Sequence, residues 1–216
     1  MNRDWAEKNK NMQSLIGKEK TFLEGVEVLL ELRKDLFEQI TSIVRANPAE
    51  AFWQMPFAKA EGYHSKTLVY SIWHIFRIED IVAHAMILQD EQVLFREGWI
   101  EKTKSPIITT GNELQGEQIA EFSKKLDMEA VYEYARAVMN STNELLKNME
   151  YKELKRKFTD ADKEKLIAGK CVSTDENAFW LIDYLIECHS ARKTGLQYLN
   201  LPVPNTWGLV LFCFVF

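Results

Sequence analysis

Four long stretches of this chain repeat their apolar residues at spacings of three, four and seven, which is the spacing of one face of an α-helix. The clearest stretch runs from Phe22 to Ala46 and is followed by Asn47-Pro48, a sequence that ends helices. Only 9 Gly and 5 Pro occur in 216 residues, and no strand pattern precedes the C-terminal tail. We therefore predict an all-α chain, with a four-helix bundle as the leading architecture. The other three long stretches run from about Ser65 to Arg96, from Asp127 to Met149 and from about Thr174 to Leu199.

Shorter helices are expected in the segments that connect the long ones. The residues before Phe22 predict a short helix that is interrupted at Gly17. At the start of the second and third long helices, Ser65 and Asp127 are the expected N-caps, because their side-chain oxygens can accept a hydrogen bond from a free backbone N–H. Further short helices are predicted at 118–126 and at 160–168, the latter ended by Gly169.

The length of the chain suits one buried domain and does not require a second. We assign residues 1–205 to a single helical-bundle domain and residues 206–216 to an apolar tail without an assigned role. The run Leu209–Phe216 is too short for a transmembrane helix, which needs roughly 20 apolar residues. A strand, a tucked core segment, an aggregation-prone end and a non-native tail remain alternatives for it.

Charge and cysteine usage exclude several classes of function. The net charge of -5 is spread over both halves of the chain, and no basic run is interleaved with aromatic residues, so a nucleic-acid partner is not expected. The three cysteines, Cys171, Cys188 and Cys213, are widely spaced and lack metal-knuckle or redox-motif spacing. With no secretory signal at the N-terminus and no membrane span, the expected location is the reducing cytoplasm.

The four histidines carry the main functional signal. His74 and His189 fall on inward, apolar stripes of two different helical stretches, and helical bundles build metal sites from such side chains. His64 and His84 are each ten residues from His74, so neither shares a metal with it through regular helix geometry. His64 stands at the helix start, where a loop could fold it inward. The alternative for His74 is a hydrogen-bonded core residue.

Lys193 lies one helical turn after His189 and faces the same way. A histidine at that position would complete a two-ligand clamp and, with His74, a three-nitrogen site. Protonated lysine instead repels a cation, and only a strongly lowered pKa would free its lone pair. The metal hypothesis is therefore weakened at this position.

Two segments resemble the motifs of a known family. Residues 71–80, SIWHIFRIED, are similar to the first histidine motif of the DinB/YfiT-like superfamily of four-helix-bundle proteins. Residues 189–195, HSARKTG, align with the second motif of that family, commonly His-x-x-His-His-Arg-Gly. The order of the helices extends the resemblance over most of the chain.

The resemblance implies a bacterial, often dimeric bundle that holds nickel, zinc or iron with three histidines. Members include thiol S-transferases of the bacillithiol type, so the implied activity is metal-dependent thiol transfer or hydrolysis. Carried over by position, His74 matches the first ligand and His189 the second. Lys193 stands at the third ligand position, and Arg192 replaces the additional histidine before it.

Three hypotheses follow from the replacement of the family's histidines by Arg192 and Lys193. In the first, an enzyme keeps its metal through His74, His189 and a substitute, for which His64, Glu79, Asp80 and water are the candidates. In the second, a metal-free pocket uses Lys193 and Arg192 to bind a carboxylate or phosphate ligand, unless Glu79 or Asp80 neutralises the lysine in a structural ion pair. In the third, the chain is a stress-associated interaction protein that works through a dimer face.

Overall fold

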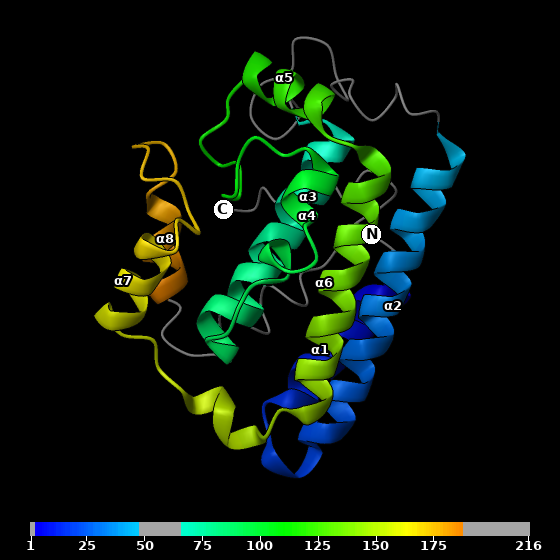
Figure 1. Cartoon of the computed structure of the whole chain (residues 1–216). Helices are drawn as coiled ribbons and strands as arrows, with labels where there is room; N and C mark the ends of the chain where they lie inside the picture. Colours follow the sequence, from blue (N-terminus) through cyan, green and yellow to red (C-terminus); the bar gives the residue numbers. More distant parts are fainter. Residues whose placement is uncertain (1–2, 48–65, 188–216) are drawn as a thin grey trace.

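The computed structural model describes residues 3–47 and 66–187 (Figure 1). Every regular element within these two ranges is helical, and no strand occurs in them. This confirms the all-α class. The C-terminal tail 206–216, which was set apart from the domain, lies outside the described residues.

The long helices begin and end largely where their sequence signals stand. Helix α1 spans Arg3–Ile16, α2 spans Phe22–Ala46 and α6 spans Met128–Asn148. The Asp127 carboxylate caps α6 by accepting a hydrogen bond from Ala130 N, as predicted. In Figure 1, α2 and α6 run side by side, and α6 also contacts α3, which spans Leu68–Asp80.

The predicted second helix is shorter than its apolar pattern suggested. It begins as α3, Leu68–Asp80, and continues as a π-helical segment, η4, over Ile81–Leu88. Gln89 then takes the left-handed conformation with a φ of 56°, so the predicted extension to Arg96 is wrong. The N-cap is Thr67, whose Oγ1 accepts a hydrogen bond from Tyr70 N at 3.1 Å. Ser65, the predicted cap, lies outside the described residues.

Tertiary hydrogen bonds explain why the second helix ends before Arg96. After Gln89 the chain turns back, and the Asp80 carboxylate accepts hydrogen bonds from Val93 N at 2.8 Å and Leu94 N at 3.0 Å. These two backbone donors are therefore satisfied without a helix, and the chain forms a single 3₁₀ turn, η5, over Val93–Phe95.

Short helices fill the connections, as expected. Helix α7 has the predicted bounds, Asp160–Ala168, and α5, which spans Glu117–Lys125, covers most of the predicted segment. The last helix, α8, begins at Trp180, later than the predicted start near Thr174, and is described up to Glu187. The remaining short elements are η1 (Glu19–Thr21), α4 (Trp99–Thr103) and η6 (Tyr151–Lys155).

The described apolar core divides into three clusters. One joins α3 to α2, α5 and α6, a second joins α1 to α2 and the end of α6, and the third joins η4 to α7 and α8. In the second cluster α1 and α2 approach so closely that a Cβ on Gly25 would stand 2.6 Å from Ile16 N. Glycine at this position therefore permits the contact between the two helices.

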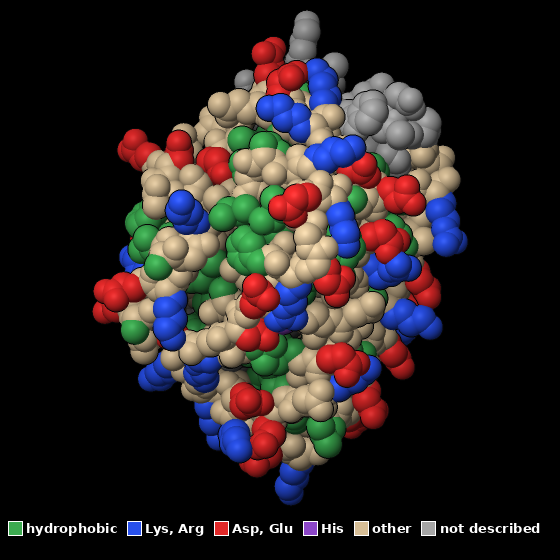
Figure 2. Space-filling model, in the orientation of Figure 1, with side chains coloured by type: hydrophobic (Ala, Val, Ile, Leu, Met, Phe, Trp, Pro, Cys, Tyr) green, Lys and Arg blue, Asp and Glu red, His purple; other side chains and the backbone are tan. Residues whose placement is uncertain are grey.

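The described surface has a mixed charge. On the face shown in Figure 2, Lys and Arg side chains are interspersed with Asp and Glu side chains. None of the helices in the two described ranges is long and apolar enough to cross a membrane.

Candidate functional site

His74 lies in the middle of α3 with only 2% of its surface exposed. Its Nδ1 is 2.6 Å from the carbonyl oxygen of Thr110, in the loop between α4 and α5. On the other side the ring of Tyr70 stacks on the imidazole, with centroids 5.5 Å apart and planes at 12°. The ring is therefore fixed by one hydrogen bond and one stacking contact.

The same loop is anchored to α3 at a second point. Tyr70 Oη donates a hydrogen bond to Gly111 O at 2.9 Å. Gly111 has a φ of +82°, and a Cβ there would stand 3.0 Å from the Tyr70 ring, so this position suits only glycine. Tyr70 and His74 thus hold adjacent residues of one loop, and the loop in turn orients the imidazole.

Burial lowers the pKa of His74 to about 4, because desolvation penalises the charged ring and outweighs the opposing hydrogen bond to Thr110. The imidazole is therefore neutral at neutral pH. A carbonyl only accepts, so Nδ1 carries the proton and donates it to Thr110 O. Among the described residues Nε2 has no hydrogen-bond partner, and its lone pair is the one available to a ligand.

Arg77, one turn after His74, is the centre of a buried polar network. Its side chain is fully buried and donates to Asp80 Oδ2 at 2.8 Å, to Gln92 Oε1 at 2.9 Å and to Ile108 O at 2.8 Å. Tyr134 Oη lies 3.1 Å from Arg77 Nη1 and donates to Asp80 Oδ2 at 2.8 Å. Burial raises the pKa of Tyr134, so its hydroxyl stays protonated as a donor.

Asp80 is fully engaged in this network. Its two oxygens accept from Arg77, from Tyr134 and from the backbone N–H groups of Val93 and Leu94. A carboxylate with four donors has little capacity left for a cation. Asp80, a candidate substitute ligand by sequence, is a structural residue that joins α3, α6 and η5.

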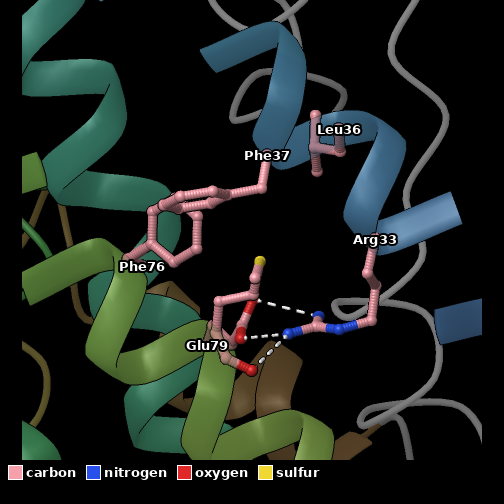
Figure 3. Close-up of a pocket in the computed structure, with 6 residues that line it drawn as sticks. Arg33, Leu36, Phe37, Phe76 and Glu79 are labelled. Carbon is pink, nitrogen blue, oxygen red and sulfur yellow. Dashed lines mark hydrogen bonds and ion pairs between the residues drawn. The ribbon is translucent and has the colours of Figure 1, made fainter. Parts of the chain in front are cut away.

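Glu79 points to a different side of α3. It forms a buried, bidentate ion pair with Arg33 of α2 (Figure 3). Arg33 Nη2 lies 2.7 Å from Glu79 Oε1, and Arg33 Nη1 lies 3.2 Å from Glu79 Oε2. Arg33 Nε also donates to Asn143 Oδ1 at 2.7 Å. The pair lines one side of a small pocket, and the other lining residues are apolar: Leu36, Phe37, Phe76 and Met139.

The remaining predicted site residues lie outside the described ranges. They are His64, His189, Arg192 and Lys193. Within residues 3–47 and 66–187, no group of three His, Cys, Asp or Glu side chains is arranged to hold a metal ion. His74 fits one ligand position through its neutral ring and its Nε2, and the described part of the chain supplies that ligand alone.

The sequence did not predict two contacts between residues that are far apart along the chain. Arg33, the partner of Glu79, lies 46 residues away from it and is indistinguishable by sequence from other helical arginines. His84, set aside because of its distance from His74, is buried and contacts Asp90 and Ser141, the latter 57 residues away. No local spacing identifies either pair.

Comparison of the chain with models of protein families and with curated proteins found no match. The resemblance to the DinB/YfiT-like superfamily therefore rests on the two segments around His74 and His189.

Proposed function

We propose that this chain is a cytoplasmic, dimeric four-helix bundle of the DinB/YfiT type, with a degenerate metal site that uses His74 and His189. Lys193 stands where the third histidine would be, and the metal is nickel, zinc or iron. The activity that goes with such a site is transfer of a small thiol or hydrolysis. The observation that carries the proposal is the hydrogen bond from His74 Nδ1 to Thr110 O, which leaves Nε2 for a ligand.

This hydrogen bond is the arrangement that metal-binding histidines adopt in proteins. A ligating histidine donates its second ring N–H to a carbonyl or carboxylate, which fixes the tautomer and the direction of the coordinating nitrogen. His74 also has the required charge state, since its lowered pKa of about 4 keeps the ring neutral. A core histidine with both nitrogens engaged would not support the proposal.

The metal, when bound, supplies positive charge that lowers the pKa of a coordinated thiol or water. The chain itself contributes orientation. Thr110 O keeps the His74 proton on Nδ1, and the stacked Tyr70 ring restricts rotation of the imidazole. Glu79 and Asp80 are not needed as ligands in this proposal, because arginines already neutralise both.

Elemental analysis of the purified full-length chain tests the proposal first. We then expect thermal stabilisation of the stripped protein by nickel, zinc, iron(II) or manganese, and loss of bound metal in His74→Ala. His84→Asn is the matched control, since it removes another buried histidine of the same helical stretch and should keep the metal. Lys193→His should increase metal affinity. A wild-type protein without metal and without a metal-induced shift would exclude the proposal.

A second candidate function is a metal-free bundle that acts as a binding or interaction protein. The pairing of Glu79 with Arg33 and of Asp80 with Arg77 favours it, because the acidic side chains nearest to His74 in sequence are not available to a cation. Nor are they available to Lys193, which would leave a positive charge for an anionic ligand. Stabilisation by phosphate or a small carboxylate, lost in Lys193→Met, would favour this function over the metal site.

A further inference from the structure

A second cluster of polar side chains, separate from His74, consists of Asp90, His84 and Ser141 joined by hydrogen bonds in that order. We call this cluster the relay. His84 Nδ1 is 2.6 Å from Asp90 Oδ1, and His84 Nε2 is 2.9 Å from Ser141 Oγ. The histidine comes from η4, the aspartate from the turn that follows η4, and the serine from α6. A carboxylate on one ring nitrogen and a hydroxyl on the other is the order found in acid–base–nucleophile triads.

The hydrogen bonds define the protonation of the ring. A carboxylate only accepts, so His84 Nδ1 carries a proton and donates to Asp90. Arg96 Nη2 is also within hydrogen-bond distance of this nitrogen, at 3.2 Å, and shares its two hydrogens among Nδ1, Asp90 Oδ2 at 3.1 Å and Glu91 O. The shorter 2.6 Å contact with Asp90 Oδ1 is the one that assigns the proton to Nδ1. In the neutral ring Nε2 is then the acceptor, and Ser141 Oγ donates to it.

The orientation of Ser141 differs from that of five other helical hydroxyls in the described ranges. Hydroxyls inside helices commonly donate to the carbonyl four residues earlier. Ser141 Oγ does not bond the carbonyl of Ala137, and its hydrogen bond goes to the histidine. The hydroxyls that do bond back in this way are those of Thr41, Ser42, Ser71, Thr103 and Ser123.

The relay extends from the interior to the surface. The His84 side chain is 1% exposed, whereas that of Asp90 is 48% exposed and Ser141 is half-buried. The imidazole is thus shielded from water, and the serine that it contacts is partly exposed. A buried base next to a partly exposed hydroxyl is the combination that activates a serine.

We propose that Asp90, His84 and Ser141 form an activated-serine site that accepts acyl groups from small, activated carboxylic esters. Ser141 Oγ attacks the carbonyl carbon while its proton moves to His84 Nε2. The new Oγ–C bond forms, the bond from the carbonyl carbon to the leaving oxygen breaks, and the leaving alcohol takes the proton from Nε2. Water then attacks the acyl-serine with His84 as base, which releases the carboxylic acid and restores the Ser141 hydroxyl.

The position of Ser141 limits the substrates. It lies in the interior of α6 (Met128–Asn148), where backbone N–H groups are used by the helix. Helix α6 therefore supplies no free backbone donor for an oxyanion at this serine, and in dedicated hydrolases each such donor contributes about 10² to 10³ in rate. We expect acylation only by esters with good leaving groups, at rates well below those of dedicated hydrolases.

The test uses the full-length chain with p-nitrophenyl acetate and with a fluorophosphonate probe. We expect a burst of p-nitrophenol and a covalent adduct that peptide mass spectrometry localises to Ser141. The adduct should disappear in Ser141→Ala. Ser42→Ala is the matched control, because Ser42 is more exposed but bonded to Glu38 O, and this variant should keep full labelling.

The relay is tested separately from the nucleophile. A general base contributes about 10² to 10⁴ in rate, so His84→Gln should slow labelling of Ser141 about a hundredfold or more. Asp90→Asn changes a half-exposed residue, is expected to leave the fold intact by circular dichroism, and should slow labelling at least tenfold. Absence of a wild-type adduct, an adduct on another residue, or unchanged labelling in the folded Asp90→Asn protein would each overturn the proposal.

Discussion

His74 and Thr110 are joined by a 2.6 Å hydrogen bond between a ring nitrogen of α3 and a backbone carbonyl of the loop between α4 and α5. The bond places a neutral imidazole in the interior and determines which nitrogen carries the proton. The fold thus controls both the charge and the orientation of the residue on which the proposed function depends.

Stability should fall in acid because of His74. Its pKa is about 4 in the folded protein, against 6.5 for the unperturbed group, so the unfolded chain binds the additional proton first as pH decreases. The folded state is then disfavoured progressively below pH 6.5, by about 3 kcal/mol at pH 4. Urea unfolding at pH 7, 5 and 4 would measure this loss. His74→Gln cannot titrate and should show a smaller loss, and equal pH dependence of the two proteins would contradict the assignment.

Removal of the His74 side chain should destabilise the protein moderately at neutral pH. His74→Ala leaves Thr110 O without its donor and the Tyr70 ring without its stacking partner. We expect a loss of about 1–3 kcal/mol in the free energy of unfolding. Denaturant unfolding at pH 7 checks this value. No measurable loss would indicate that water replaces the imidazole in an open pocket.

Removing Glu79 alone should destabilise the protein more than replacing both Arg33 and Glu79 by apolar residues. Glu79→Leu leaves a buried guanidinium without its carboxylate and should cost about 3–5 kcal/mol. The double variant Arg33→Met/Glu79→Leu removes both charges from a pocket with apolar walls and should be more stable than Glu79→Leu alone. A double-mutant cycle by chemical denaturation measures the difference, and additive losses would show that the two residues do not interact.

Asp80→Asn should release the segment that follows η4. The neutral amide cannot match the four hydrogen bonds of the carboxylate, and it leaves the buried Arg77 charge unpaired. We expect a loss of about 3–5 kcal/mol and faster hydrogen exchange at the amides of Val93 and Leu94. Asp35→Asn is the control, because its ion pair with Lys8 is exposed and is worth at most about 1 kcal/mol. Unchanged protection of the two amides in Asp80→Asn would refute this role.

Gly25→Ala should destabilise the contact of α1 with α2, although alanine is the better helix former. The added Cβ would meet Ile16 N at 2.6 Å, so the two helices must separate. Overpacking of this kind costs about 1–3 kcal/mol. The exposed neighbouring variant Glu24→Ala lacks this clash and serves as the control in thermal unfolding. A gain in stability for Gly25→Ala would show that α1 adapts freely.

The helix ends that carry a capping or helix-breaking residue were predicted from the sequence. The end of α2 before Pro48, the Asp127 cap of α6 and the end of α7 at Gly169 all match residues that act on their own backbone. The second helix failed this rule. Its apolar pattern continued to Arg96, but the chain leaves the helix at Gln89. The Asp80 carboxylate then accepts hydrogen bonds from the backbone N–H groups of Val93 and Leu94.

The candidate site was predictable only in part. His74 on an inward helical stripe followed from periodicity, and the structure brings it to Thr110. The occupation of Glu79 by Arg33 and the contact of His84 with Ser141 did not follow, since the partners are 46 and 57 residues apart. His189, Arg192 and Lys193 lie outside the described residues, so their place in the site stays a prediction.

The sequence by itself determined that the chain is helical, because helical periodicity and capping act within a few residues of the backbone. It also determined that His74 faces the interior from α3. Only the tertiary structure decided which of the buried polar groups meet. A buried charge must find a partner wherever packing brings one, and that choice depends on how the helices are placed against each other.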